Sequence, residues 1–86
     1  MKSTTPRLTF YYRENCHLCD DMWRHLRELQ TGRDFDFELV RVDVDSDNVL
    51  QQRFGTLVPV LLGDDRVICN YYLDPEALER YLTGVV

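Results

Sequence analysis

The apolar positions of this 86-residue chain follow two different periods in its first third. Residues 7–12 form a dense run of β-branched and aromatic side chains, which is typical of a strand. From Cys16 to Gln30 the apolar residues instead recur every three or four positions, so they share one face of a helix. That face consists of Cys19, Met22, Trp23, Leu26 and Leu29. The pattern predicts a strand and a helix joined by a short loop, residues 13–15.

Residues with known capping preferences mark the ends of this predicted helix. We expect Asn15 to cap its N-terminus, because an asparagine side chain can accept hydrogen bonds from the unpaired N–H groups of a first turn. We expect Gly32 to end the helix in a left-handed conformation. The polar lead-in from Met1 to Pro6 is expected to be mobile.

The second half of the chain predicts shorter elements. Gly63-Asp64-Asp65 separates two apolar runs and predicts a hairpin, and Asp74-Pro75 is a strong helix start. The predicted elements are a strand over 37–43, a helix over 48–54 capped by Asp47, strands over 57–62 and 67–72, and a helix from Asp74. The order β-α-β-α-β-β-α predicts an α/β domain, with one mixed four-stranded sheet flanked by three helices.

Length, charge and hydropathy narrow the class of protein. A chain of 86 residues buries one core, so we expect one domain over residues 1–86, its core at about 7–82, and a monomer. The net charge of −5 gives no reason to expect a nucleic acid or an anionic membrane as partner. No apolar run of about 20 residues is present, and the N-terminus does not resemble a signal peptide. The expected compartment is therefore the cytoplasm.

Cys16 and Cys19 are the candidate reactive groups. Positions i and i+3 of a helix lie roughly 5–6 Å apart on one face, which is close enough for a disulfide. The N–H groups and the dipole at the helix start favour the thiolate of Cys16, and the neighbouring Arg13 and His17 can add positive charge. We therefore expect Cys16 to attack a substrate disulfide, and Cys19 to resolve the mixed disulfide by forming a redox-active Cys16–Cys19 bond.

Other uses of the cysteines stay open at this point. A structural zinc site needs about four ligands, and beyond the pair the chain offers only His17, His25 and Cys69, so we expect no bound metal. A metal or iron-sulfur carrier and a non-catalytic adaptor that binds a protein partner are the remaining alternatives. Cys69 is expected to be a buried small apolar residue, with a third redox thiol as the alternative.

The stretch from Tyr12 to Cys19 resembles the glutaredoxin branch of the thioredoxin superfamily. In that family a strand leads into a loop with a basic residue, here Arg13, three positions before the nucleophilic cysteine. Val58-Pro59-Val60 resembles the second family signature. The resemblance implies that the bond before Pro59 is cis, that it lies against the cysteines, and that the backbone of Val58 pairs with an extended substrate.

The resemblance extends over roughly residues 7–82 and implies a thioredoxin/glutaredoxin fold with strand order 2-1-3-4. The C-H-L-C-D sequence is most similar to small bacterial glutaredoxin-like proteins. His17-Leu18 replaces the Pro-Tyr of typical glutaredoxins, and no Gly-Gly-Asp sequence follows the strand after Pro59. Because both features normally help to bind glutathione, we expect no bound cofactor and only weak grounds for glutathione as a partner.

The expected function is that of a glutaredoxin-like thiol–disulfide oxidoreductase in cell redox homeostasis. Its substrate would be a protein disulfide or a low-molecular-weight thiol. Its reductant would be glutathione or a donor of the thioredoxin-reductase type. Tyr71 and Tyr72 are expected either to line a partner groove beside Pro59 or simply to pack.

Overall fold

The computed structural model describes residues 5–32 and 36–84. Of the N-terminal lead-in that was expected to be mobile, Met1–Thr4 lie outside these residues. The elements, in chain order, are β1 (Arg7–Tyr12), α1 (His17–Thr31), β2 (Glu38–Asp43), a 3-10 helix η1 (Val44–Ser46), α2 (Asn48–Phe54), β3 (Val60–Gly63), β4 (Arg66–Asn70) and α3 (Pro75–Thr83). Within the segments that the structure describes, no helix is both long enough and apolar enough to cross a membrane.

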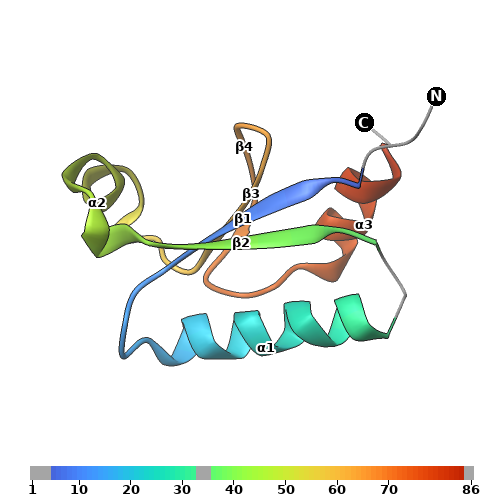
Figure 1. The fold of residues 1–86 in the computed structure, drawn as a ribbon, viewed down its shortest axis with the longest axis horizontal. Coiled ribbons are helices and arrows are strands. Elements are labelled where there is room, and N and C mark those ends of the chain that lie inside the picture. The colour runs from blue at the N-terminus through green and yellow to red at the C-terminus, as the bar shows by residue number, and fades with distance from the viewer. Residues whose placement is uncertain (1–4, 33–35, 85–86) are drawn as a thin grey trace.

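The four strands form one mixed sheet in the order β2-β1-β3-β4, which confirms the predicted topology. β1 runs parallel to β2, and β3 runs antiparallel to both β1 and β4. Figure 1 shows α1 along one face of the sheet and α2 at one end of the other face. The same view shows the loop between β1 and α1 at the same end of the molecule as α2 (Figure 1).

Alternation along the strands divides the core into two clusters. Leu8 and Phe10 of β1 and Leu61 of β3 pack with residues of α1 and with Leu78 of α3. Val60 and Leu62 point to the opposite face, where they pack with Val44, Phe54 and the partly buried Tyr11. The predicted apolar stripe of α1 is confirmed, since Cys19, Met22 and Leu26 are buried and Trp23 and Leu29 pack against the same cluster.

Of the two capping predictions for the first helix, the N-cap was wrong and the C-cap was right in position but wrong in conformation. The N-cap is Cys16, because Asn15 adopts a left-handed φ of 60° that turns the chain one residue before the helix begins. Gly32 is the C-cap, as predicted, but its φ of −77° lies in the right-handed region and not in the expected left-handed one. The caps at Asp47 and Asp74 are confirmed, because each carboxylate accepts a hydrogen bond from a backbone N–H of the first turn.

The third and fourth strands are shorter than predicted, for identifiable reasons. Leu57 and Val58 were expected in a strand, but both backbone N–H groups donate to the carbonyl of Phe54 at the end of α2. This turn delays β3 until Val60. β4 ends at Asn70, because Tyr71 has a φ of +67° that cannot continue an extended strand.

Candidate active site

Cys16 and Cys19 form a disulfide across the start of α1, with their Cα atoms 5.2 Å apart. Their separation matches the spacing expected for positions i and i+3. Cys16 is partly exposed, whereas Cys19 is only 2% exposed. The two cysteines therefore differ in exposure, and Cys16 is the more accessible of the pair.

Helix α1 directs its first turn at the sulfur of Cys16. The backbone N–H of Cys19 donates to Cys16 Sγ at 3.1 Å, and the N–H of Asp20 donates to the Cys16 carbonyl at 3.0 Å. Cys16 thus takes the place of the Ser, Thr, Asp or Asn that usually caps a helix. A negative charge on this sulfur would lie at the positive end of the helix dipole.

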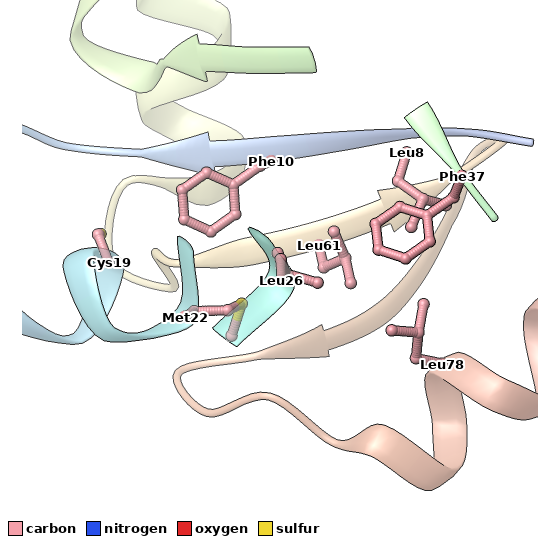
Figure 2. Close-up of a cluster of buried hydrophobic side chains, with 8 residues drawn as sticks. All are labelled: Leu8, Phe10, Cys19, Met22, Leu26, Phe37, Leu61 and Leu78. Carbon is pink, nitrogen blue, oxygen red and sulfur yellow. The ribbon is translucent and has the colours of Figure 1, made fainter. Parts of the chain in front are cut away.

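Cys19 belongs to the main hydrophobic core. Figure 2 shows it at one end of the cluster, on the first turns of α1, near Phe10 and Met22. Tyr12 and Cys16 are partly buried and pack against the same cluster. The active-site helix is thereby fixed against the sheet, and the buried sulfur can reach Cys16 without a large movement of the backbone.

Arg13 comes from the loop after β1, and its guanidinium contacts a carboxylate that the sequence did not reveal. Arg13 Nε and Nη2 lie 3.1 and 3.2 Å from the two oxygens of Asp45 in η1. This contact holds the pKa of Asp45 below its usual value, with a smaller effect from the Gln51 side chain. The positive charge of Arg13 is therefore largely compensated by Asp45, and its effect on Cys16 stays a prediction.

His17 is the first residue of α1 and its side chain is exposed. Among the side-chain hydrogen bonds of residues 5–32 and 36–84, none involves its imidazole. Its influence on the neighbouring sulfur also stays a prediction.

The Val58–Pro59 peptide bond is cis, as the resemblance implied. Pro59 is buried, and Val58 is partly buried between the two core clusters. The Val58 N–H donates to the Phe54 carbonyl at 3.1 Å, whereas its own carbonyl accepts no hydrogen bond from the part of the chain that the structure describes. In this conformation only the carbonyl is open to an extended substrate, so pairing through both groups stays a prediction.

The end of β4 tethers the loop that carries Pro59. Asn70 Nδ2 donates to the Leu57 carbonyl at 3.3 Å, and Tyr71 Oη donates to the Thr56 carbonyl at 2.8 Å. The Tyr71 N–H donates to the Pro59 carbonyl, also at 2.8 Å. Sequence reasoning missed this tether, because no sequence pattern places a tyrosine at a positive φ or aims its hydroxyl at a loop carbonyl.

Cys69 is a free cysteine on β4, opposite Leu61 of β3. It is partly rather than fully buried and packs against the main core cluster. Burial raises the pKa of its thiol, while a hydrogen bond from the backbone of Asp74 acts in the opposite direction. The thiol is therefore kept largely protonated at neutral pH.

The structure also bears on the metal alternatives. Residues 5–32 and 36–84 contain no group of three or more His, Cys, Asp or Glu side chains that could hold a metal ion. Within these segments, His17, His25 and Cys69 do not join the cysteine pair in a zinc site.

Comparison with known proteins links this geometry to one family. Residues 7–83 match the family model described as the Glutaredoxin-like domain (DUF836). Protein Ne2328 from Nitrosomonas europaea is 34% identical, with a TM-score of 0.82 over 95% of this chain and 96% of that one. Target protein XcR50 from X. campestris is 30% identical, with a TM-score of 0.66 over 92% and 99%.

More distant structures share the fold. Thioredoxin 1 from Thermosipho africanus is 17% identical, with a TM-score of 0.59 over 91% of this chain and 96% of that one. At this identity the similarity shows a thioredoxin-like fold and nothing more. A search of curated proteins finds no match to the chain.

Proposed function

We propose that this chain, which belongs to the Glutaredoxin-like domain family (DUF836), is a thiol–disulfide oxidoreductase that uses Cys16 as nucleophile and Cys19 as resolving thiol. The observation that carries the proposal is the asymmetry of the pair. Cys16 is partly exposed and its sulfur caps a helix, whereas Cys19 is buried and is bonded to it. This arrangement separates the attacking role from the resolving role.

The exchange takes place in two steps. The Cys16 thiolate attacks one sulfur of a substrate disulfide, so that a Cys16–substrate disulfide forms and the other substrate sulfur leaves as a thiolate. Cys19, on losing its proton, then attacks Cys16 Sγ, which closes the Cys16–Cys19 disulfide and releases the second substrate thiolate. Two electrons pass from the dithiol to the substrate, and both thiolates take protons from water.

The cycle needs a thiol or dithiol donor that returns two electrons to the Cys16–Cys19 disulfide. Such a donor is available in a reducing compartment such as the cytoplasm. His17-Leu18 stands in place of the Pro-Tyr that helps typical glutaredoxins bind glutathione, which favours a dithiol donor or a protein thiol over glutathione. The Val58 carbonyl also supports the proposal, because Val58 packs against the same core cluster as Cys16 and its carbonyl can accept a main-chain hydrogen bond from an extended substrate segment.

Trapping of the mixed disulfide tests the proposal. Reduced Cys19→Ser protein is mixed with a short peptide disulfide, and the products are identified by mass spectrometry without a reducing agent. We expect a stable adduct of one peptide on Cys16, because the resolving thiol is absent. The wild-type protein should instead release both peptide thiols and end as the Cys16–Cys19 disulfide.

A matched variant separates attack by Cys16 from general thiol reactivity. Cys16→Ser keeps the buried Cys19 and the half-buried Cys69, and we expect it to form no adduct on the time scale of Cys19→Ser. Equal adduct formation by the two variants, or no adduct with either, would refute the proposal and favour a non-catalytic adaptor.

A further inference from the structure

Four side chains on one side of the active-site helix form a surface that the proposed exchange does not use. Arg41 of β2 lies over two aromatic rings, with its Cζ atom 4.5 Å from the Tyr12 ring centroid and 4.8 Å from that of Trp23. Arg27, one turn beyond Trp23 on α1, lies 6.0 Å from the same indole. We call Tyr12, Trp23, Arg27 and Arg41 the arginine–tryptophan patch.

The two aromatic rings hold the Arg41 guanidinium beside them without using its hydrogen-bond donors. A guanidinium donates its N–H groups in its own plane, whereas aromatic rings contact its two faces. Arg41 is exposed, and its side chain makes no hydrogen bond or ion pair within the segments that the structure describes. A carboxylate can therefore approach in the plane and accept two parallel hydrogen bonds without any need to order the side chain first.

The two arginines of the patch lack a carboxylate partner among the residues that the structure describes. The four ion pairs found there involve Arg7, Arg13, Arg24 and Arg80. Arg41 and Arg27 have no carboxylate oxygen within 4 Å in these segments, and Arg27 Nη1 contacts only the amide oxygen of Gln30, at 3.4 Å. In a chain with a net charge of −5, this is a local concentration of uncompensated positive charge.

The patch lies within reach of a substrate bound at Cys16. Trp23 is seven residues beyond Cys16, which places it two turns along the same helix face, or about 10 Å away. An extended peptide covers that distance in about three residues. A substrate whose cysteine is attacked by Cys16 can thus place a side chain three residues away against Arg41.

We propose that the arginine–tryptophan patch binds an acidic segment, with Asp or Glu side chains about three residues from the target cysteine, on the protein substrate. The inference rests on the proposed function, since it names the kind of protein disulfide that the chain would select. The charge of the patch is complementary to carboxylates, and the stacked guanidinium suits their planar, two-oxygen geometry.

A matched pair of substrates tests the preference. The disulfide dimers of two short peptides are used, one with Glu and one with Gln three residues to either side of the cysteine. Prereduced protein is mixed with each peptide at low salt, and the single-turnover rate constant is measured by chromatography. We expect the Glu peptide to react about three- to tenfold faster, with most of this difference lost at about 0.5 M salt.

Variants assign the preference to the patch. Arg41→Gln should remove the difference between the rates for the two peptides. Arg24→Gln is the matched control, because Arg24 is on the same helix but is paired with Asp21 at 3.2 Å, and it should keep the preference. Arg41→Lys, which keeps the charge but not the planar fork, should fall between wild type and Arg41→Gln.

The outcomes that overturn the proposal are distinct from a failure of the redox function. No preference in wild type, or equal losses in Arg41→Gln and Arg24→Gln, would overturn it. The proposal would also be overturned if Arg41→Gln changed the rate of reduction of glutathione disulfide but left the rate for the Glu peptide unchanged. A Glu peptide with Ser in place of its cysteine cannot exchange, and should still change Trp23 fluorescence saturably in wild type but not in Arg41→Gln. That result would support the patch even if neither peptide disulfide were reduced, and its absence would count against the patch alone.

Discussion

The backbone N–H of Cys19 donates a hydrogen bond to Sγ of Cys16, with 3.1 Å between nitrogen and sulfur. Cys19 therefore buries its side chain in the core and uses its backbone to contact the sulfur of the partly exposed Cys16. This relationship links the fold to the chemistry, because the apolar stripe that anchors α1 also aims its N-terminus at Cys16.

In the reduced protein we expect Cys16 to react with iodoacetamide at pH 6 at least about tenfold faster than Cys19 or Cys69. The helix start favours the Cys16 thiolate, whereas Cys19 is inaccessible and burial raises the pKa of the Cys69 thiol. Mass spectrometry of digested protein after short labelling gives the three rates. Rapid labelling should disappear in Cys16→Ser, and initial labelling at Cys69 would contradict the assignment.

Because Arg13 and Asp45 form an ion pair, we expect substitutions of these two residues to have unequal effects on the rate at which iodoacetamide labels Cys16. Arg13→Gln should change the Cys16 rate at pH 6 by less than about twofold, because the Asp45 carboxylate already compensates the guanidinium. Asp45→Asn leaves that charge uncompensated and should raise the rate by a larger factor. If Arg13→Gln slowed the reaction strongly while Asp45→Asn had no effect, Arg13 would act on Cys16 independently of Asp45.

The tether between Tyr71 and the loop before Pro59 predicts a loss of both stability and rate on removal of one hydroxyl. Tyr71→Phe eliminates the hydrogen bond to the Thr56 carbonyl and should lower the free energy of unfolding by about 0.5–1 kcal/mol. It should also slow the single-turnover reduction of a peptide disulfide, because the Val58 carbonyl is held less firmly. Denaturant unfolding and stopped-flow measurements give the two quantities.

The adjacent tyrosine provides the control for this tether. Tyr72 is 70% exposed and its hydroxyl makes no hydrogen bond within the described segments, so Tyr72→Phe should leave both quantities unchanged. Equal effects of the two substitutions would show that the hydroxyl of Tyr71 does not hold the loop.

Tyr81 predicts a pH dependence of stability in the alkaline range. Burial raises the pKa of Tyr81, and the hydrogen bond that its hydroxyl donates to Asp64 at 2.7 Å raises it further. The unfolded chain therefore loses this proton at a lower pH than the folded one, starting near the ordinary value of about 10. Stability from this group is complete below that pH and is lost as pH rises through the folded pKa.

The comparison of wild type with Tyr81→Phe isolates this effect. The difference in the free energy of unfolding between the two proteins should favour wild type at pH 8 and shrink steadily above pH 10. A difference that stayed constant up to pH 11 would contradict the link between the Tyr81 proton and stability.

The sequence predicts the fold well because the two hydrophobic periods are long and uninterrupted. The stripe from Cys19 to Leu29 and the caps at Asp47 and Asp74 are local signals, and the structure confirms them. The N-cap prediction for Asn15 was wrong because asparagine is common both at helix N-caps and in left-handed turns. In this fold Asn15 adopts the left-handed turn. Strand ends were misplaced where the turn after Phe54 and the left-handed Tyr71 interrupt apolar runs.

The candidate site could be predicted only as far as its motif residues. The pairing of Cys16 and Cys19 follows from their spacing at a helix start, whereas the cis bond before Pro59 was implied only by the resemblance to glutaredoxins. The contact of Arg13 with Asp45 and the stacking of Arg41 depend on the parallel register of β1 and β2, which brings Tyr12 beside Asp43 and Phe10 beside Arg41. Sequence periodicity predicts that these strands pair but does not fix which residues face each other.

The most direct test of the account is a redox equilibrium of the Cys16–Cys19 pair. The protein is incubated in glutathione and dithiothreitol buffers of graded potential, quenched with acid and alkylated, and each cysteine is quantified by mass spectrometry. We expect Cys16 and Cys19 to change state together in one reversible two-electron transition, and Cys69 to stay a thiol throughout. For a two-electron transition the ratio of oxidised to reduced protein changes tenfold for every change of about 30 mV in the buffer potential. A pair that stayed oxidised or stayed reduced over the whole range, or that exchanged partners with Cys69, would contradict the assignment of a redox-active dithiol.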